Sequence, residues 1–202
     1  MATITLPRSR ARLGLGVLAV ALAVVAGVLV WRLTAQPEAP YADPASTGAL
    51  TLCSARGEAV SGGKTADRPF AGFVLGESAL PDGADPTGAV ATLYAYQPRE
   101  GVSPAEFSGT TITAATPYAD PARPAAVVTD QAWSLGDFVT AFPAGFDGYV
   151  QLRLVLGTPA LGTVPDHYDT ADIKVDGDTW ELVRGGHASC RDAAEAVTTG
   201  GS

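Results

Sequence analysis

The sequence lacks asparagine and contains few lysines and few histidine, cysteine and methionine residues, which are common ligands of transition metals. It has two lysines, Lys64 and Lys174, two histidines, two cysteines, and one methionine, Met1. Copper handling relies on clusters of methionine and histidine, so this composition argues against it. Alanine, glycine, proline and arginine are frequent instead. That bias is typical of a high-GC genome, such as that of a Gram-positive actinobacterium.

The sequence also lacks the short motifs that mark common active sites. It contains no G-x-S-x-G, P-loop, dinucleotide fingerprint, H-E-x-x-H or Cys-x-x-Cys. Only His167 and His187 could serve as a histidine base. We expect His167, between Asp166 and Tyr168, to be a solvated loop residue, and His187 to be a residue near the chain end. We therefore predict no catalytic residue and no cofactor.

Basic charge is scarce over most of the chain. Arg8, Arg10, Arg12 and Arg32 flank an apolar run near the N-terminus, and the other nine basic residues and all 21 acidic residues follow that run. The part after Arg32 therefore carries a formal charge of 9 minus 21, or −12. A surface this acidic repels phosphate groups, so we exclude nucleic acid as a partner.

One long hydrophobic run is present, Leu13–Trp31, with nineteen residues and no charge. As a helix it would extend about 28 Å, close to the thickness of a bilayer's hydrocarbon core. The arginines before it predict that residues 1–12 stay in the cytoplasm and that the rest is exported. We predict an uncleaved transmembrane anchor over 13–31 in the cell membrane. The alternative is cleavage near Ala35 and secretion, although the run is longer than a usual signal peptide's.

Small residues recur along one face of this run. Ala19, Ala23 and Gly27 lie at i, i+4 and i+8, which lets two membrane helices approach closely. We expect this spacing to reflect the abundance of alanine in the run, and the alternative is self-association through this face.

The two cysteines, Cys53 and Cys190, lie near opposite ends of the exported part. Outside the cytoplasm such a pair usually oxidises. The bond would close a loop of about 138 residues, worth up to about 5 kcal/mol. The alternative is a metal site that includes His187, but one histidine and two cysteines are fewer than the four ligands of a usual structural zinc site. We predict a structural disulfide and no metal.

Short runs of alternating polarity, separated by Gly, Pro and Asp, predict a series of strands. In Tyr149–Leu156 the even-numbered residues are apolar and face one way, with Gln151 and Arg153 opposite. Asp176-Gly177-Asp178 predicts a tight hairpin. The predicted strands cover residues 49–53, 70–75, 90–96, 109–115, 125–129, 149–156, 171–175 and 179–183.

One segment follows a helical period. Leu135, Phe138, Val139 and Phe142 recur at i, i+3, i+4 and i+7. Ser134 and Asp137 have the spacing of a capping box, and Pro143 stops the element. We predict one short helix over residues 134–142.

The stretch Pro143-Ala144-Gly145-Phe146-Asp147-Gly148-Tyr149-Val150-Gln151-Leu152 resembles the E–F corner and F strand of immunoglobulin-like and fibronectin-III-like sandwiches. The resemblance implies that Tyr149 is the corner tyrosine, which hydrogen-bonds to the backbone upstream. Neither cysteine lies two residues after Tyr149, which departs from the antibody pattern. In layout and composition the exported part also resembles membrane-anchored envelope proteins of actinobacteria.

These signals predict a mainly β protein. We expect a single antiparallel, immunoglobulin-like β-sandwich with one short helix over residues 49–191. A Pro/Ala-rich linker over 32–48 would join it to the membrane helix, and residues 192–202 would form a flexible tail.

One hexapeptide occurs twice: Pro40–Ala45 and Pro117–Ala122 both read PYADPA. Proline at both ends favours an extended, exposed conformation. Tyr41, Asp43, Tyr118 and Asp120 are therefore candidate docking residues for a partner. The alternative is two surface loops of similar composition.

Acidic residues are densest in one stretch near the predicted hairpin. Calcium takes six to eight oxygen ligands, often from loops, but the spacing here does not match an EF-hand. We expect these acidic side chains to lie in turns and to be exposed to solvent. The alternative is a binding site for a hard cation such as calcium. The candidate oxygen ligands are Asp166, Asp169, Asp172, Asp176 and Asp178.

Aromatic residues are a further set of candidate ligand-binding residues. Trp133, Trp180, Tyr94, Tyr96, Phe107 and Tyr118 would form a ligand platform where exposed, although one or two tryptophans usually fill the core of a domain this size. We predict a non-enzymatic envelope protein that binds a protein or glycan or has a structural role. The alternatives are a hydrolase acting on envelope polysaccharide through acidic residues, and an accessory subunit of a membrane complex.

Overall fold

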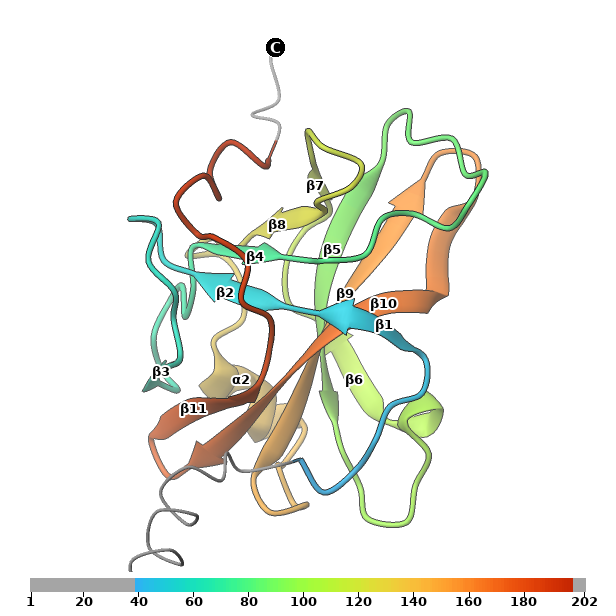
Figure 1. Ribbon diagram of the computed structural model, residues 1–202. Coiled ribbons are helices and arrows are strands. Elements are labelled where there is room, and N and C mark those ends of the chain that lie inside the picture. The colour runs from blue at the N-terminus through green and yellow to red at the C-terminus, as the bar shows by residue number, and fades with distance from the viewer. Residues whose placement is uncertain (1–38, 198–202) are drawn as a thin grey trace, which may run out of the picture. The chain divides into compact units, whose positions relative to one another are not determined.

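The computed structural model describes residues 39–197, which form a mainly β domain with two sheets and one α-helix (Figure 1). The predicted cytoplasmic segment 1–12, the transmembrane segment 13–31 with its Ala19, Ala23 and Gly27 face, and the end of the predicted tail lie outside this range. Within the described range, no helix has the length and hydrophobicity that a membrane span requires.

The larger sheet has eight strands and forms the back of the view in Figure 1. Six strands follow one another across it, β1 adds to β10, and β7 adds to β5. All pairs are antiparallel except β1 with β10, which is parallel and so departs from the predicted all-antiparallel arrangement. The order is β3 (Gly62–Lys64), β11 (Thr179–Arg184), β10 (Gly162–Asp176), β9 (Tyr149–Thr158), β5 (Val90–Gln97) and β6 (Ser108–Thr111), with β1 (Ser46–Ala49) and β7 (Thr116–Pro117) beside them.

The smaller sheet consists of β2 (Thr51–Cys53), β4 (Phe73–Leu75) and β8 (Ala125–Val127), in that order. Its strands run across those of the large sheet in Figure 1. The chain passes from one sheet to the other at Leu50, which separates β1 from β2 and is fully buried. The predicted strand 49–53 is therefore divided between the two sheets.

The predicted helix is confirmed as α2 (Leu135–Ala141). Ser134 is its N-cap, and the Ser134 and Asp137 side chains form the predicted capping box. Leu135 and Phe138 are the buried residues of the helix. One short 3₁₀ helix, η1 (Pro104–Glu106), lies between β5 and β6.

A single cluster of buried side chains includes residues from both sheets and the helix. The small sheet contributes Leu52 and Val74, and the large sheet contributes Leu93, Leu152 and Ile173. Burial of apolar surface at about 25 cal/mol per Å² makes this shared core the main source of stability.

The hairpin predicted at Asp176-Gly177-Asp178 is confirmed as the turn between β10 and β11, with Gly177 at a φ of 58°. Strand β10 is much longer than the predicted 171–175. Its first half pairs with the end of β9, and the register shifts between Val164 and Tyr168.

Both ends of the described range pack on the domain, which differs from the predicted linker and tail. Ala39 is buried, and β1 begins at Ser46, inside the predicted linker 32–48. At the other end Ala196 and Val197 are buried, and Ala119 donates its backbone N–H to the carbonyl of Ala196 at 2.9 Å.

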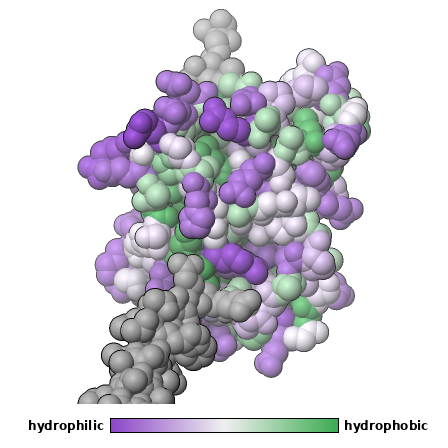
Figure 2. All heavy atoms as spheres, in the orientation of Figure 1, coloured by the Kyte–Doolittle hydropathy of each residue, from purple (hydrophilic) through white to green (hydrophobic). Residues whose placement is uncertain are grey.

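The surface seen in Figure 2 carries hydrophilic side chains over most of its area, with a narrower strip of hydrophobic ones between them. Residues 39–197 include 20 acidic and nine basic residues, a balance of 9 minus 20, or −11. The described domain therefore keeps the acidic character predicted for the exported part.

Candidate functional site

Polar side chains are buried on the outer face of the large sheet, the face away from the shared core. On β9 the side chains of Val150 and Leu152 join the core, and the alternation of a strand turns Gln151 and Arg153 to the other side. The predicted facing is thus observed, but Gln151 is 0% and Arg153 5% exposed. Buried charges need partners, so something must cover this face.

Residues 39–49, which we name the N-terminal strap, supply those partners. The strap ends in β1, which pairs with β10. Tyr41 is the first side chain that the strap inserts. Its ring makes edge contacts with Phe107 at 5.5 Å and Tyr149 at 6.4 Å between centroids, and Phe146 lies at 6.3 Å. The ring is therefore enclosed by aromatic residues from two loops and the start of β9.

Asp43 is the second inserted side chain, and it pairs with Arg153 of β9. Asp43 Oδ2 lies 3.4 Å from Arg153 Nη2, and the two side chains are 2% and 6% exposed. Tyr168 donates its hydroxyl to Asp43 at 3.0 Å. The strap is thereby joined to β9 and β10 at one point.

The guanidinium of Arg153 is held on every side. It donates to the Gln151 side chain at 2.7 Å and to the Pro104 carbonyl at 2.8 Å. The rings of Tyr96 and Tyr168 lie against it, with centroids 4.1 and 4.6 Å from Cζ. Such cation–π contacts gain strength when the cation is desolvated, as it is here.

A second ion pair contacts Tyr41 and joins the buried Asp172 to Arg184, whose side chain is 39% exposed. Asp172, fully buried on β10, accepts a short hydrogen bond from the Tyr41 hydroxyl. Arg184 of β11 donates to the same carboxylate from Nε at 2.6 Å and lies within 2.5 Å through Nη2. Burial raises the pKa of Asp172, while Tyr41 and Arg184 oppose that rise. Burial also raises the pKa of Tyr41, and the Asp172 charge adds to that effect.

We name the group formed by Tyr41, Asp43, Arg153, Asp172 and Arg184 the strap clamp. It brings together Tyr41 and Asp43, predicted as docking residues, and Asp172, predicted as a cation ligand. Each carboxylate in it pairs with an arginine and accepts a hydrogen bond from a tyrosine hydroxyl. For the fully buried Asp43–Arg153 pair, loss of one partner costs about 3–5 kcal/mol, because a buried charge is left uncompensated. The arrangement therefore fixes one position of the strap.

The two copies of PYADPA fold into the same turn. In the first copy Asp43 Oδ1 accepts the N–H of Ala45 at 3.1 Å, and in the second Asp120 Oδ1 accepts that of Ala122 at 2.9 Å. Backbone bonds to the carbonyls of Asp43 and Asp120 close both turns. An aspartate that bonds to the backbone two residues on is a common turn former. The Asp-Pro-Ala part of both copies is therefore a turn, whereas Pro117 of the second copy is extended, at the end of β7.

The surroundings of the copies differ. Tyr118 is buried, but its hydroxyl has no hydrogen-bond partner among the residues that the structure describes. Asp120 pairs with Arg123 at 3.2 Å near the surface. The carboxylate of the first copy, on Asp43, is thus buried, whereas that of the second copy, on Asp120, lies near solvent.

The other candidate cation ligands are spread along β10 and its hairpin. Asp169 accepts the backbone N–H groups of Glu77 at 2.6 Å and Ser78 at 2.9 Å. Asp178 pairs with Lys64 at 2.9 Å, while Asp166 and Asp176 are exposed. Over residues 39–197, no group of three His, Cys, Asp or Glu side chains is placed to hold a metal ion.

Tyr149 and the two histidines complete the predicted set. Tyr149 is buried at the start of β9 and packs on Tyr41, as a structural residue would. The predicted loop position of His167 is wrong, because it lies in β10, where its Nε2 is 2.6 Å from the Ala79 carbonyl oxygen. His187 is exposed, three residues before Cys190.

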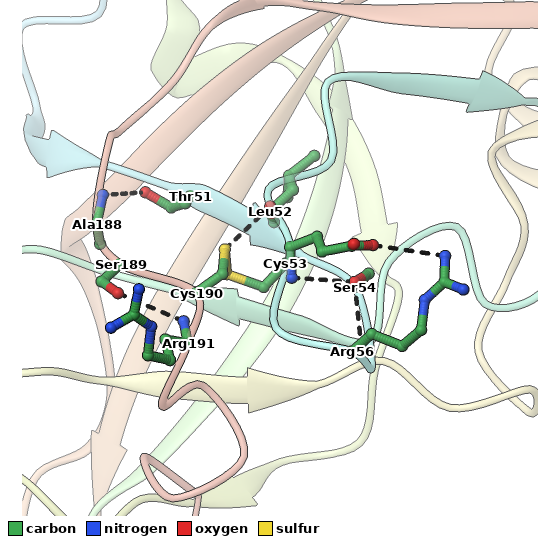
Figure 3. Close-up of a disulfide and its surroundings, with 10 residues drawn as sticks. Thr51, Leu52, Cys53, Ser54, Arg56, Ala188, Ser189, Cys190 and Arg191 are labelled. Carbon is green, nitrogen blue, oxygen red and sulfur yellow. Dashed lines mark hydrogen bonds and ion pairs between the residues drawn. A yellow bond between two sulfur atoms is a disulfide. The ribbon is translucent and has the colours of Figure 1, made fainter.

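The predicted disulfide is confirmed between Cys53 and Cys190 (Figure 3). It joins the end of β2 to the segment after β11, with 5.4 Å between the Cα atoms. Two hydrogen bonds support this crossing, from Ala188 N–H to Thr51 Oγ1 at 2.9 Å and from Gly186 N–H to the Leu50 carbonyl at 2.7 Å. The bond thus holds the C-terminal segment on the small sheet.

Sequence reasoning did not single out Tyr168, Arg184 or Arg153 as members of a site. A detectable signal existed for one of them, since Arg153 is a charged residue in the middle of the most hydrophobic predicted strand. Comparison of the chain with protein families, with curated proteins and with solved structures finds no match.

Proposed function

We propose that this protein is a membrane-anchored, non-enzymatic component of the cell envelope, with its β domain outside the cytoplasm. Residues 13–31 would be the single anchor, with residues 1–12 in the cytoplasm. The disulfide supports an oxidising compartment for the domain, because such bonds persist mainly outside the cytoplasm. The composition supports an actinobacterial envelope as its setting.

The strap clamp is the observation that carries this proposal. The strap begins at Ala39, and only residues 33–38 separate it from Arg32 at the end of the proposed anchor. Fully extended, this connection reaches at most about 25 Å. A connection this short would limit how far the domain can move from a membrane anchor. That suits a part that meets neighbours at the membrane surface.

We further propose that the domain is a β-sandwich of the immunoglobulin-like kind. The shared core of the two sheets supports this layout. The buried Tyr149 after the Asp147–Gly148 turn supports a tyrosine corner. Sandwiches of this kind present loops at their ends as contact surfaces, which favours binding to a protein or glycan.

The short connection also favours a second candidate, an accessory subunit of a membrane protein complex. The helix face of Ala19, Ala23 and Gly27 would contact a membrane partner or a second copy.

Two experiments test the proposal. A reporter that is active only in the cytoplasm, fused after residue 202, should be silent, while the same reporter fused after residue 12 should be active. A bright C-terminal fusion would overturn the topology. Cross-linking in native membranes, followed by identification of the attached molecules, should recover envelope components. Recovery of the uncross-linked monomer alone would contradict an interaction role.

A further inference from the structure

Trp133 is an exposed tryptophan on a domain that buries most of its large apolar side chains. It is 41% exposed, and among the described residues only Leu161 is also an exposed large hydrophobic. Trp180, by contrast, is 3% exposed. A single exposed apolar side chain is common on protein surfaces, so the groups beside Trp133 decide what this indole can bind.

The local fold fixes Trp133 on the surface. Ala132 before it is buried and closes a turn by donating its N–H to the Thr129 carbonyl at 3.0 Å. Ser134 after it caps α2, which turns Leu135 to the core. Trp133 therefore stands between two constrained residues and is excluded from the core by the start of the helix.

A cleft of about 420 Å³ lies beside the indole, lined by Arg68, Gln131, Trp133, Asp137 and Thr140. The Arg68 guanidinium pairs directly with the Asp137 carboxylate, and both residues line the cleft. The backbone N–H of Gly136 donates to the Thr65 carbonyl at 2.8 Å and holds the Arg68 loop against the helix. One wall is thus an aromatic face and the others are fixed polar groups.

These groups match the chemistry of a sugar. The guanidinium donates hydrogen bonds, the carboxylate accepts them, and the Gln131 amide does both, as hydroxyl groups of a sugar require. The indole offers a flat apolar surface with the area of a sugar ring's C–H face. An apolar small molecule would instead need an enclosed hydrophobic pocket.

We propose that this cleft binds a hexose unit of an envelope polysaccharide, with Trp133 stacked on the sugar ring. The inference rests on the proposed envelope function and names its ligand class. Arg68 and Asp137 hold each other in place, and the Gln131 amide supplies a further hydrogen-bonding group to the sugar hydroxyls. The site is separate from the strap clamp, which shares none of its residues.

The test uses the full chain in lipid nanodiscs, which avoids sugar-based detergents. Linear hexasaccharides of glucose, mannose, galactose and N-acetylglucosamine are titrated, with calorimetry and tryptophan fluorescence as readouts. We expect at least one of them to bind, Trp133→Ala to weaken that binding at least tenfold, and Gln131→Ala to weaken it severalfold. Leu161→Ala, which removes the other exposed apolar side chain, should bind as the natural chain does.

Unfolding midpoints of the three variants should stay close to that of the natural chain, which separates lost binding from lost folding. Failure of all four sugars to bind, or binding unchanged in Trp133→Ala, overturns the inference. A photoreactive residue at position 133 that cross-links to a protein in native membranes, and to no polysaccharide, also overturns it. That last result would leave the proposed envelope role standing.

Discussion

Asp43 and Arg153, which are 110 positions apart in the chain, form an ion pair almost completely shielded from solvent. The pair joins the start of the domain to a central strand of its large sheet. Buried ion pairs specify one arrangement more than they add net stability. The second hexapeptide copy offers matched controls for the strap clamp, because Asp120 corresponds to Asp43 and Tyr118 corresponds to Tyr41.

Asp43→Ala should lower the free energy of unfolding by about 3–5 kcal/mol, because Arg153 would remain buried without its carboxylate. Asp120→Ala changes the same position of the second hexapeptide copy and breaks the same kind of turn. Its exposed ion pair is screened by solvent, so we expect a much smaller loss than for Asp43→Ala. Chemical unfolding of both variants measures the difference. Equal losses would mean that the turn, and not the buried pair, is what Asp43 supplies.

Tyr41→Phe should cost about 1–3 kcal/mol, since it removes the hydroxyl that donates to the buried Asp172 carboxylate. Tyr118→Phe is its matched control. The Tyr118 hydroxyl is buried without a hydrogen-bond partner in the described part of the chain, so its removal should be neutral or slightly stabilising. The same unfolding measurement applies. A Tyr118→Phe variant less stable than Tyr41→Phe would contradict the assigned roles.

Cys53→Ser combined with Cys190→Ser should lower the free energy of unfolding by about 2–5 kcal/mol, because the closed loop is long. Reduction of the natural chain should give the same loss. Mass analysis without reductant should detect no free thiol before reduction. Two free thiols in protein taken from its native membrane would refute the bond.

Stability should fall in alkaline solution in a defined range. Burial raises the pKa of Tyr168 to about 12, whereas the pKa of a tyrosine in the unfolded chain is about 10. Because the folded value is the higher one, this contribution is complete below pH 10 and is lost as the pH rises towards 12. Tyrosinate absorbance, followed together with circular dichroism, should show some tyrosines ionising only on unfolding. Ionisation of all six tyrosines near pH 10 in a folded chain would contradict this.

Local signals predicted much of the secondary structure. The alternation in 90–96 and 149–156, the helical period ending at Phe142, and the turn at Gly177 each depend on neighbours within a few residues, and each corresponds to an observed element. The first half of β10 escaped prediction, because residues 162–167 do not alternate and are held by pairing with β9.

The strap clamp could not be predicted because its partners are distant in sequence. Nothing near Asp43 indicates that Arg153 lies above it, and the proline-rich composition around Asp43 is equally typical of a free linker. The repeat was a real signal, but its meaning depended on tertiary contacts that differ between the two copies. Arg153 was assigned to the correct face of its strand. The sequence did not indicate that the N-terminal strap covers this face.

The parallel pairing of β1 with β10 has a mechanical consequence. The strap enters the sheet along the direction of its strands, and Ser46, Gly48 and Ala49 pair with successive residues of β10. A force applied to the N-terminal end along this axis would load those hydrogen bonds and the Asp43–Arg153 pair in shear, all at once, and would not peel them apart one by one. The attachment is thus built to resist tension where the chain enters the domain.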